Sequence, residues 1–213
     1  PPGVAGGAWP CPIDGRTVPA VTSRGSPCGC VHGSSNPGLP AGARKAQRRL
    51  PADRVAALCR ALGARHGATR LLLLDELLNA SEEHLDAVLD ACEALGVRVE
   101  IPNGLRADLL PDRQGRRLAA RVTTLAGSAE SGVQRVVDEV VGKRLDLREV
   151  ERVAAAARDA ALPLLVHFII GLPGESATEV NGTLAFAAAL RERFGATPAV
   201  QYATPLPGTP LAA

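Results

Sequence analysis

The sequence contains few aromatic residues and little net charge. Its 213 residues include three Phe, one Trp, one Tyr and no Met, so a platform of aromatic rings for stacking nucleic-acid bases is not expected. The formal net charge is +2, which predicts neither a nucleic acid nor a membrane surface as a partner. Four basic residues between positions 44 and 49 are interpreted as a solvated loop. Apolar runs such as residues 71–74 are far too short to span a bilayer.

The chain also shows neither a secretory signal nor a disulfide framework. No charged segment followed by an apolar segment opens it. Its five cysteines are odd in number and unevenly spaced, which argues against a set of paired bridges. Cys59 and Cys92 lie on the apolar stripes of expected helices and are interpreted as core residues. A reducing, cytoplasmic setting fits this pattern.

Strand-like and helix-like segments alternate from residue 17 onward. Residues 1–16 are rich in Gly and Pro without periodicity, which indicates a linker or poorly ordered arm, and residues 17–213 are expected to form one core domain. The expected strands are "TVPAVTS", "ATRLLLLDE", "VRVEIPNG", "ARVTTLAG", "LPLLVHFIIG" and "TPAVQYATP". The predicted fold class is α/β: a parallel sheet of about six strands with crossover helices. A partial (β/α)6 TIM-like barrel is expected, and an open doubly wound sheet also fits.

The expected helices carry recognisable ends. Ser81 is the predicted N-cap of a helix that Gly96 terminates, and Ser176 with Glu179 has the spacing of a capping box. A weaker helix is expected over residues 107–119.

Polar and glycine-rich residues follow each expected strand. The segments are "SRGSPCGCVHG", "DE" at 75–76, "NGLR", "GSAESG", "GLPGES" and "TPLPGTP". Since the carboxyl ends of parallel strands share one rim, and α/β proteins carry their chemistry there, these segments predict a site at that rim. Two non-functional interpretations stay open. Asp75 and Glu76 fit a solvated loop, and His167 fits a core histidine inside its strand.

The stretch "TSRGSPCGCVHG", residues 22–33, holds the candidate metal ligands. Cys28 and Cys30 are either ligands or free thiols, and His32 is either a third ligand or a solvent-facing loop residue. A small zinc module that also uses Cys11 is a further alternative, although C-x-C-x-H is not a common zinc spacing.

Together, these segments resemble the radical S-adenosylmethionine superfamily, in particular its cobalamin-associated and methylthiotransferase-like branches. The resemblance covers residues 17–211 and is carried by "TSRG", "LLLLDE", "NGLRAD", "SAESGVQRVVDEVVGK", "FIIGLPGES" and "ATPLPGTPL". In that family a CxxxCxxC loop after the first strand binds a 4Fe-4S cluster, and the cluster's open iron chelates S-adenosylmethionine. Reduction then yields a 5'-deoxyadenosyl radical.

This sequence departs from the family motif in the cysteine loop. The three ligand positions are occupied by Ser26, Cys30 and Gly33. Cys28, His32 or Cys11 would have to replace the missing thiolates, and none has the family spacing.

The resemblance also implies a set of residues that bind S-adenosylmethionine. These residues are Glu130, Ser131, Gly171, Glu175, Asn103 and Arg106. Other readings remain for each segment: Glu130 would complement a helix N-terminus, "GLPGES" would be an ordinary turn, and Asn103 and Arg106 would be loop residues.

The function that the resemblance implies is radical-initiated chemistry on an unknown substrate. S-adenosylmethionine and a 4Fe-4S cluster would be its cofactors, a flavodoxin or ferredoxin its reductant, and a cobalamin-binding domain elsewhere a further component. The alternative is a catalytically inactive relic of the fold that retains at most nucleotide or S-adenosylmethionine binding.

Overall fold

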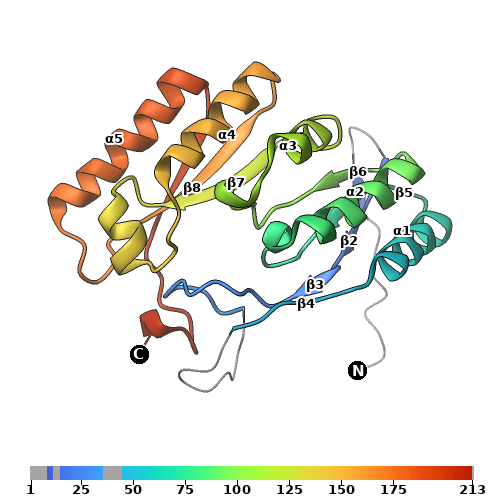
Figure 1. The fold of residues 1–213 in the computed structure, drawn as a ribbon, viewed down its shortest axis with the longest axis horizontal. Coiled ribbons are helices and arrows are strands. Elements are labelled where there is room, and N and C mark those ends of the chain that lie inside the picture. Colours follow the sequence, from blue (N-terminus) through green and yellow to red (C-terminus); the bar gives the residue numbers. More distant parts are fainter. Residues whose placement is uncertain (1–8, 12–14, 36–44, 213) are drawn as a thin grey trace.

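The computed structural model describes residues 9–11, 15–35 and 45–212, in which strands alternate with helices (Figure 1). The strands are β1 (Trp9–Cys11), β2 (Gly15–Ala20), β3 (Ser23–Arg24), β4 (Arg48–Arg49), β5 (Ala68–Leu73), β6 (Arg98–Glu100), β7 (Leu125–Glu130), β8 (Leu164–Ile170) and β9 (Thr197–Tyr202). The α-helices are α1 (Ala52–His66), α2 (Glu82–Leu95), α3 (Asp112–Ala119), α4 (Leu147–Asp159) and α5 (Ala177–Phe194). Short helical turns are η1 (Leu78–Ala80), η2 (Ala107–Leu109), the π-helical η3 (Val136–Val140) and η4 (Pro210–Ala212).

The predicted α/β class with parallel strands and crossover helices is confirmed. Strands β2, β5 and β6 pair in parallel, and so do β7, β8 and β9. A right-handed crossover through a helix is the usual way to join such strands, which explains the alternation read from the sequence.

The six parallel strands are divided between two sheets, where one continuous sheet was expected. One sheet holds β2, β5 and β6 together with the antiparallel β1, and the other holds β7, β8 and β9. Between β6 and β7 the ladder is reduced to one bridge, Leu105 to Gly127. Pro102 follows β6 and has no N–H to donate, and Gly104 then turns the chain at a φ of +76°. The ladder therefore cannot run on from β6 along β7.

Two local elements differ from the expectation. Within the segment predicted as an arm, Trp9–Cys11 forms β1, antiparallel to β2; residues 1–8 and 12–14 lie outside the described part. The helix expected over 107–119 is split into η2 and α3 at Pro111, because a proline disfavours helical conformation in the residue before it.

The core lies between the strands and the layer of helices that covers their outer side (Figure 1). Phe168 of β8 is fully buried and meets the Phe186 ring of α5 edge-on, with 6.3 Å between the ring centroids. Cys59 and Cys92 are buried between α1 and α2, as predicted. His167 is only half-buried, on the opposite face of β8 from Phe168. The packed outer layer gives the strand ends a rigid support.

The predicted helix ends are also present. The Ser81 hydroxyl accepts a hydrogen bond from the His84 N–H, Ser176 and Glu179 form a reciprocal capping box, and Gly96 terminates α2 at a φ of +64°. In the part of the chain that the structure describes, no helix is both long and apolar enough to cross a membrane.

Candidate functional site at the strand ends

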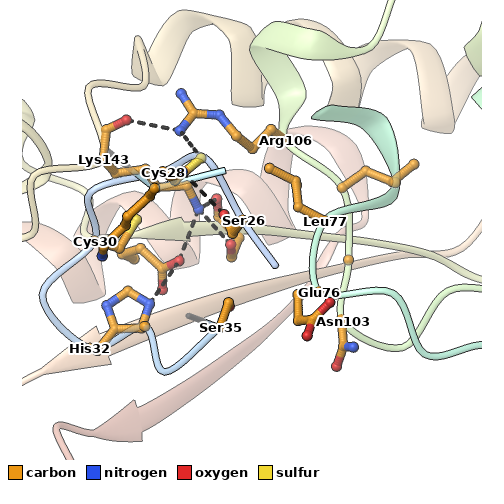
Figure 2. A pocket seen from close by; sticks show the side chains of 16 residues that line it. Ser26, Cys28, Cys30, His32, Ser35, Glu76, Leu77, Asn103, Arg106 and Lys143 are labelled. Carbon is orange, nitrogen blue, oxygen red and sulfur yellow. Dashed lines mark hydrogen bonds and ion pairs between the residues drawn. The ribbon is translucent and has the colours of Figure 1, made fainter. Parts of the chain in front are cut away.

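A cavity of about 160 Å³ lies at the carboxyl ends of β5 and β7 and the adjoining loops (Figure 2). Its polar lining comes from the loop 26–35 and from Lys45, Glu76, Asn103, Arg106, Ser128, Glu130 and Lys143. A cavity is therefore present at the predicted rim, and the structure brings together six of the predicted residues around it: Cys28, Cys30, His32, Asn103, Arg106 and Glu130.

The beginning of the cysteine loop is anchored to β5 by Asp75. This fully buried carboxylate accepts hydrogen bonds from the N–H and hydroxyl of Thr22, at 3.1 and 2.8 Å, and from the Ser23 hydroxyl at 2.6 Å. The Thr22 hydroxyl also lies 2.9 Å from Nε2 of His84. Burial lowers the pKa of His84, although Asp75 opposes the shift, so this imidazole is neutral near pH 7. Asp75 is thus a structural residue, and the solvated-loop interpretation was wrong for it.

Three more hydrogen bonds hold the rest of the loop. Glu76 accepts a hydrogen bond from the Gly25 N–H at 3.0 Å. At the far end, the Val31 N–H donates to the Val141 carbonyl at the end of η3, and the Val31 carbonyl accepts from the Leu211 N–H, both at 3.0 Å. The segment that carries Cys28 and Cys30 is therefore fixed on both sides.

Glu130 and Lys143 form a buried ion pair on the β7 side of the cavity. The Lys143 Nζ lies 2.9 Å from Oε1 of Glu130 and 2.5 Å from both the carbonyl and the hydroxyl oxygen of Ser128. The exposed fractions of the two charged side chains are 4% and 7%. A register shift between Ser128 and Glu130, with a φ of +69° at Glu130, turns the carboxylate toward the loop.

The protonation of Glu130 is set by two opposing effects. Burial raises its pKa, whereas the charge of Lys143 and, less strongly, His32 lower it, and the result lies below the ordinary value. The His32 Nε2 lies 3.7 Å from the carboxylate. Glu130 is therefore ionised at neutral pH and paired before any ligand binds.

Arg106 connects the loop to the β7 side. Its guanidinium donates to the carboxylate of Asp108 at 2.7 Å. It also donates to the Lys143 carbonyl at 2.9 Å and to the sulfur of Cys28 at 3.5 Å (Figure 2). Asn103 donates its amide to the backbone carbonyls of Leu74 and Asp75. Both residues thus position backbone in the cavity wall, and Arg106 also places a positive charge beside one thiol.

The loop carries two thiols, and no third metal ligand is placed beside them in the described part of the chain. Cys28 and Cys30 are both half-buried, and burial raises the pKa of the Cys30 thiol although Lys143 opposes the shift. Cys11 pairs with Gly15, the first residue of β2. At about 3.3 Å per residue, the two ends of β2 are roughly 17 Å apart, and the cysteine loop follows the far end. Within residues 9–11, 15–35 and 45–212, no three His, Cys, Asp or Glu side chains are placed to hold a metal ion. This arrangement gives no support to a metal site of Cys28, Cys30 and His32, and the Cys11 backbone lies at the opposite end of β2.

Three of the predicted cofactor-binding residues do not line the cavity. The buried Ser131 hydroxyl lies 2.8 Å from the Thr183 hydroxyl of α5. Gly171 adopts a φ of +77°, and Glu175 accepts hydrogen bonds from the N–H groups of Gly171 at 2.7 Å and Leu172 at 3.2 Å. In this structure these residues stabilise the turn after β8 and the contact of β7 with α5.

The sequence reasoning missed Lys143 and Ser128. Lys143 follows the apolar end of η3 in "EVVGK", and a lysine next to an apolar run is weak evidence, since most lysines are solvated. Its partners lie 13 and 15 residues away, so only the folded chain reveals the pair.

No protein-family model and no curated protein matches this sequence. Solved structures do match. The radical S-adenosylmethionine methyltransferase TsrM from Kitasatospora setae, with cobalamin and a [4Fe-4S] cluster bound, aligns with a TM-score of 0.73 at 18% identity over 91% of this chain and 38% of that chain. The cobalamin-dependent S-adenosylmethionine radical enzyme OxsB aligns at 0.63 and 15% identity, over 81% of this chain and 26% of that chain.

Methylornithine synthase (PylB) aligns at a TM-score of 0.59 and 15% identity, over 91% of this chain and 55% of that chain. The chain therefore has the core fold of the radical S-adenosylmethionine enzymes. It spans about two fifths of the TsrM chain, and identities this low establish the fold alone.

Proposed function

We propose that this chain is a radical S-adenosylmethionine-type domain that binds S-adenosylmethionine at the strand-end cavity without a three-thiolate iron–sulfur cluster. The observation that carries the proposal is the lining of the cavity, which combines paired positive and negative side chains with only two thiols. The parallel strands β2, β5 and β6 and the parallel strands β7, β8 and β9 would curve into one partial barrel around this rim.

The side chains in the cavity match the chemical groups of S-adenosylmethionine. That molecule carries a carboxylate, an ammonium and a sulfonium at one end, and the cavity offers Arg106 and Lys143 as cations and Glu76 and Glu130 as anions. The buried Nδ1 of His32 has no hydrogen-bond partner among the described residues and is available to a ligand.

The volume of the cavity defines how much of the molecule would fit. At about 160 Å³ it is smaller than ordinary ligand pockets, which begin at about 300 Å³. The amino-acid end fills such a space, and the adenosine would extend along the rim. Bound there, S-adenosylmethionine supplies an electrophilic sulfonium. The chain's own contribution is to bind and orient it: Arg106 holds the carboxylate, and the ionised Glu130 faces the positive groups.

The iron–sulfur cluster of the family does not fit these residues. A site-differentiated cluster of this kind takes three thiolates, whereas the loop presents Cys28 and Cys30, and Gly33 has no ligand atom at the third motif position. We therefore derive no radical step for this chain. Its substrate, a reductant such as a flavodoxin or ferredoxin, and a cobalamin domain would belong to a larger assembly.

Calorimetric titration of the purified chain with S-adenosylmethionine tests the binding proposal. We expect saturable binding that is at least tenfold weaker in Lys143→Met, because the ionised Glu130 loses its partner and the cavity loses a cation. Glu192→Gln, at an exposed carboxylate on α5, should bind like the parent chain. Absence of binding at millimolar concentration, or equal affinity in Lys143→Met, would contradict the proposal.

Iron and acid-labile sulfide after anaerobic reconstitution test the cluster separately. We expect only background amounts of both. About four irons and four sulfides per chain, with loss of both in Cys30→Ser, would show an assembled cluster and contradict this part of the proposal.

A further inference from the structure

We propose that Cys28 and Cys30 form a redox-active dithiol that exchanges with small disulfides. The exchange requires no bound S-adenosylmethionine, although the small disulfide and S-adenosylmethionine would occupy the same cavity. This redox activity follows from three features of the loop: two thiols with one residue between them, a cation at one sulfur, and an adjoining cavity.

The spacing of the two cysteines allows a bridge without movement of other elements. Residues two apart are separated by at most about 7 Å between Cα atoms, and disulfides span about 4.4 to 6.8 Å. Gly29 lies between them, and a side chain there would meet only the Gly142 carbonyl, at 3.8 Å. The loop is anchored on both sides, at Gly25 by Glu76 and at Val31 by Val141. The bridge therefore needs changes only between these anchors.

The surroundings assign different roles to the two thiols. The Arg106 guanidinium lies 3.5 Å from the Cys28 sulfur and favours the negative charge that this sulfur carries when it attacks. Cys30 packs against Val136 and Val141 in a small apolar cluster and has no such cation in hydrogen-bond contact among the described residues. Cys28 is thus the attacking thiol, and Cys30 resolves the intermediate.

The exchange is balanced without any bound cofactor. The Cys28 sulfur attacks one sulfur of a small disulfide, forms a mixed disulfide and releases one thiol. The Cys30 sulfur then attacks the Cys28 sulfur and releases the second thiol. The two cysteine protons end on the two released thiols, the small disulfide gains two electrons, and the dithiol loses two. The cavity beside both sulfurs, about 160 Å³, has room for the incoming group.

The test uses the metal-free chain equilibrated with mixtures of reduced and oxidised glutathione, alkylated and digested with trypsin. Both cysteines fall in one peptide, residues 25–44, whereas Cys59 and Cys92 fall in two others and serve as internal controls. We expect the 25–44 peptide to lose two hydrogens along a single titration curve, while Cys59 and Cys92 remain alkylated.

Single variants identify the order of attack. Cys30→Ser should accumulate a glutathione adduct on Cys28, and Cys28→Ser should react at least tenfold more slowly at Cys30. Arg106→Gln should slow the reaction of Cys28 by three- to tenfold, while Arg148→Gln, at an 87% exposed side chain, should not. A 25–44 peptide that stays reduced across the series, or adducts that form equally fast on both single variants, would overturn the proposal.

Discussion

Two buried carboxylates lie at strand ends in this molecule, and their partners differ in charge. Asp75, after β5, is surrounded by neutral donors: the N–H and hydroxyl of Thr22 and the hydroxyl of Ser23. Glu130, at the end of β7, is paired with the ammonium of Lys143. Asp75 lies outside the cavity lining, whereas Glu130 and Lys143 are part of it. The neutral network fixes the backbone of the loop, and the charged pair places both signs of charge where a ligand would bind.

Removal of the lysine should have the largest effect. Lys143→Met leaves Glu130 buried without its counter-ion, and breaking such a pair costs about 3 to 5 kcal/mol. We expect a matching decrease in the free energy of unfolding in urea. The double variant Lys143→Met/Glu130→Gln should recover part of the loss, because no unpaired charge remains. A loss below about 1 kcal/mol would mean that water already reaches Glu130.

Neutralising the other carboxylate should cost less. Asp75→Asn keeps the shape and an acceptor for the two hydroxyls but turns an amide donor toward the Thr22 N–H, and an unsatisfied buried group costs about 1 to 3 kcal/mol. Urea unfolding measures the loss. Asp90→Asn, at a 70% exposed side chain, is the control. Equal losses of unfolding free energy in Asp75→Asn and Lys143→Met would contradict the expectation that the charged pair contributes more to stability than the neutral network.

The Glu130–Lys143 pair should also make stability depend on pH. Glu130 has a pKa below its ordinary value of 4.5, so its contribution is complete above pH 4.5 and is lost as the pH falls through the lowered folded-state value. The free energy of unfolding of the parent chain should therefore fall more steeply below pH 4.5 than that of Glu130→Gln. Parallel curves for the two proteins would contradict the ionised pair.

The smallest effect is expected at Glu175. Glu175→Gln weakens its hydrogen bonds to the N–H groups of Gly171 and Leu172, which should cost about 0.5 to 1.5 kcal/mol and speed amide exchange at both residues. The affinity for S-adenosylmethionine should stay within twofold of the parent value, since Glu175 does not line the cavity. A tenfold loss of affinity would restore the cofactor role implied by the family resemblance.

Local signals in the sequence were sufficient to predict much of the fold. Ser81, Gly96 and the pair Ser176 and Glu179 begin or end helices because their side chains or backbone freedom satisfy groups a few residues away. The loop with Cys28 and Cys30 was correctly placed at a strand end, because the alternation of strands and helices along the chain shows where each strand ends.

The interruption of the sheet and the partners in the cavity were not predictable in this way. Pro102 and Gly104 fell within the expected strand "VRVEIPNG", and their effect on the ladder depends on which strand lies beside β6. Ser131 and Glu175 matched family motifs, yet in the structure Ser131 hydrogen-bonds to Thr183 and Glu175 accepts from the Gly171 N–H.

The sequence by itself determined the alternation of strands and helices, their caps, the rim that carries polar residues, and the absence of two thiolates from the cluster motif. These properties depend on neighbouring residues or on residue identity alone. Only the tertiary structure decided that Lys143 neutralises Glu130, that Asp75 anchors Thr22, and that Arg106 contacts Cys28. Each of these pairs joins separate segments of the chain, and their energies arise from burial, which exists only once the chain has folded.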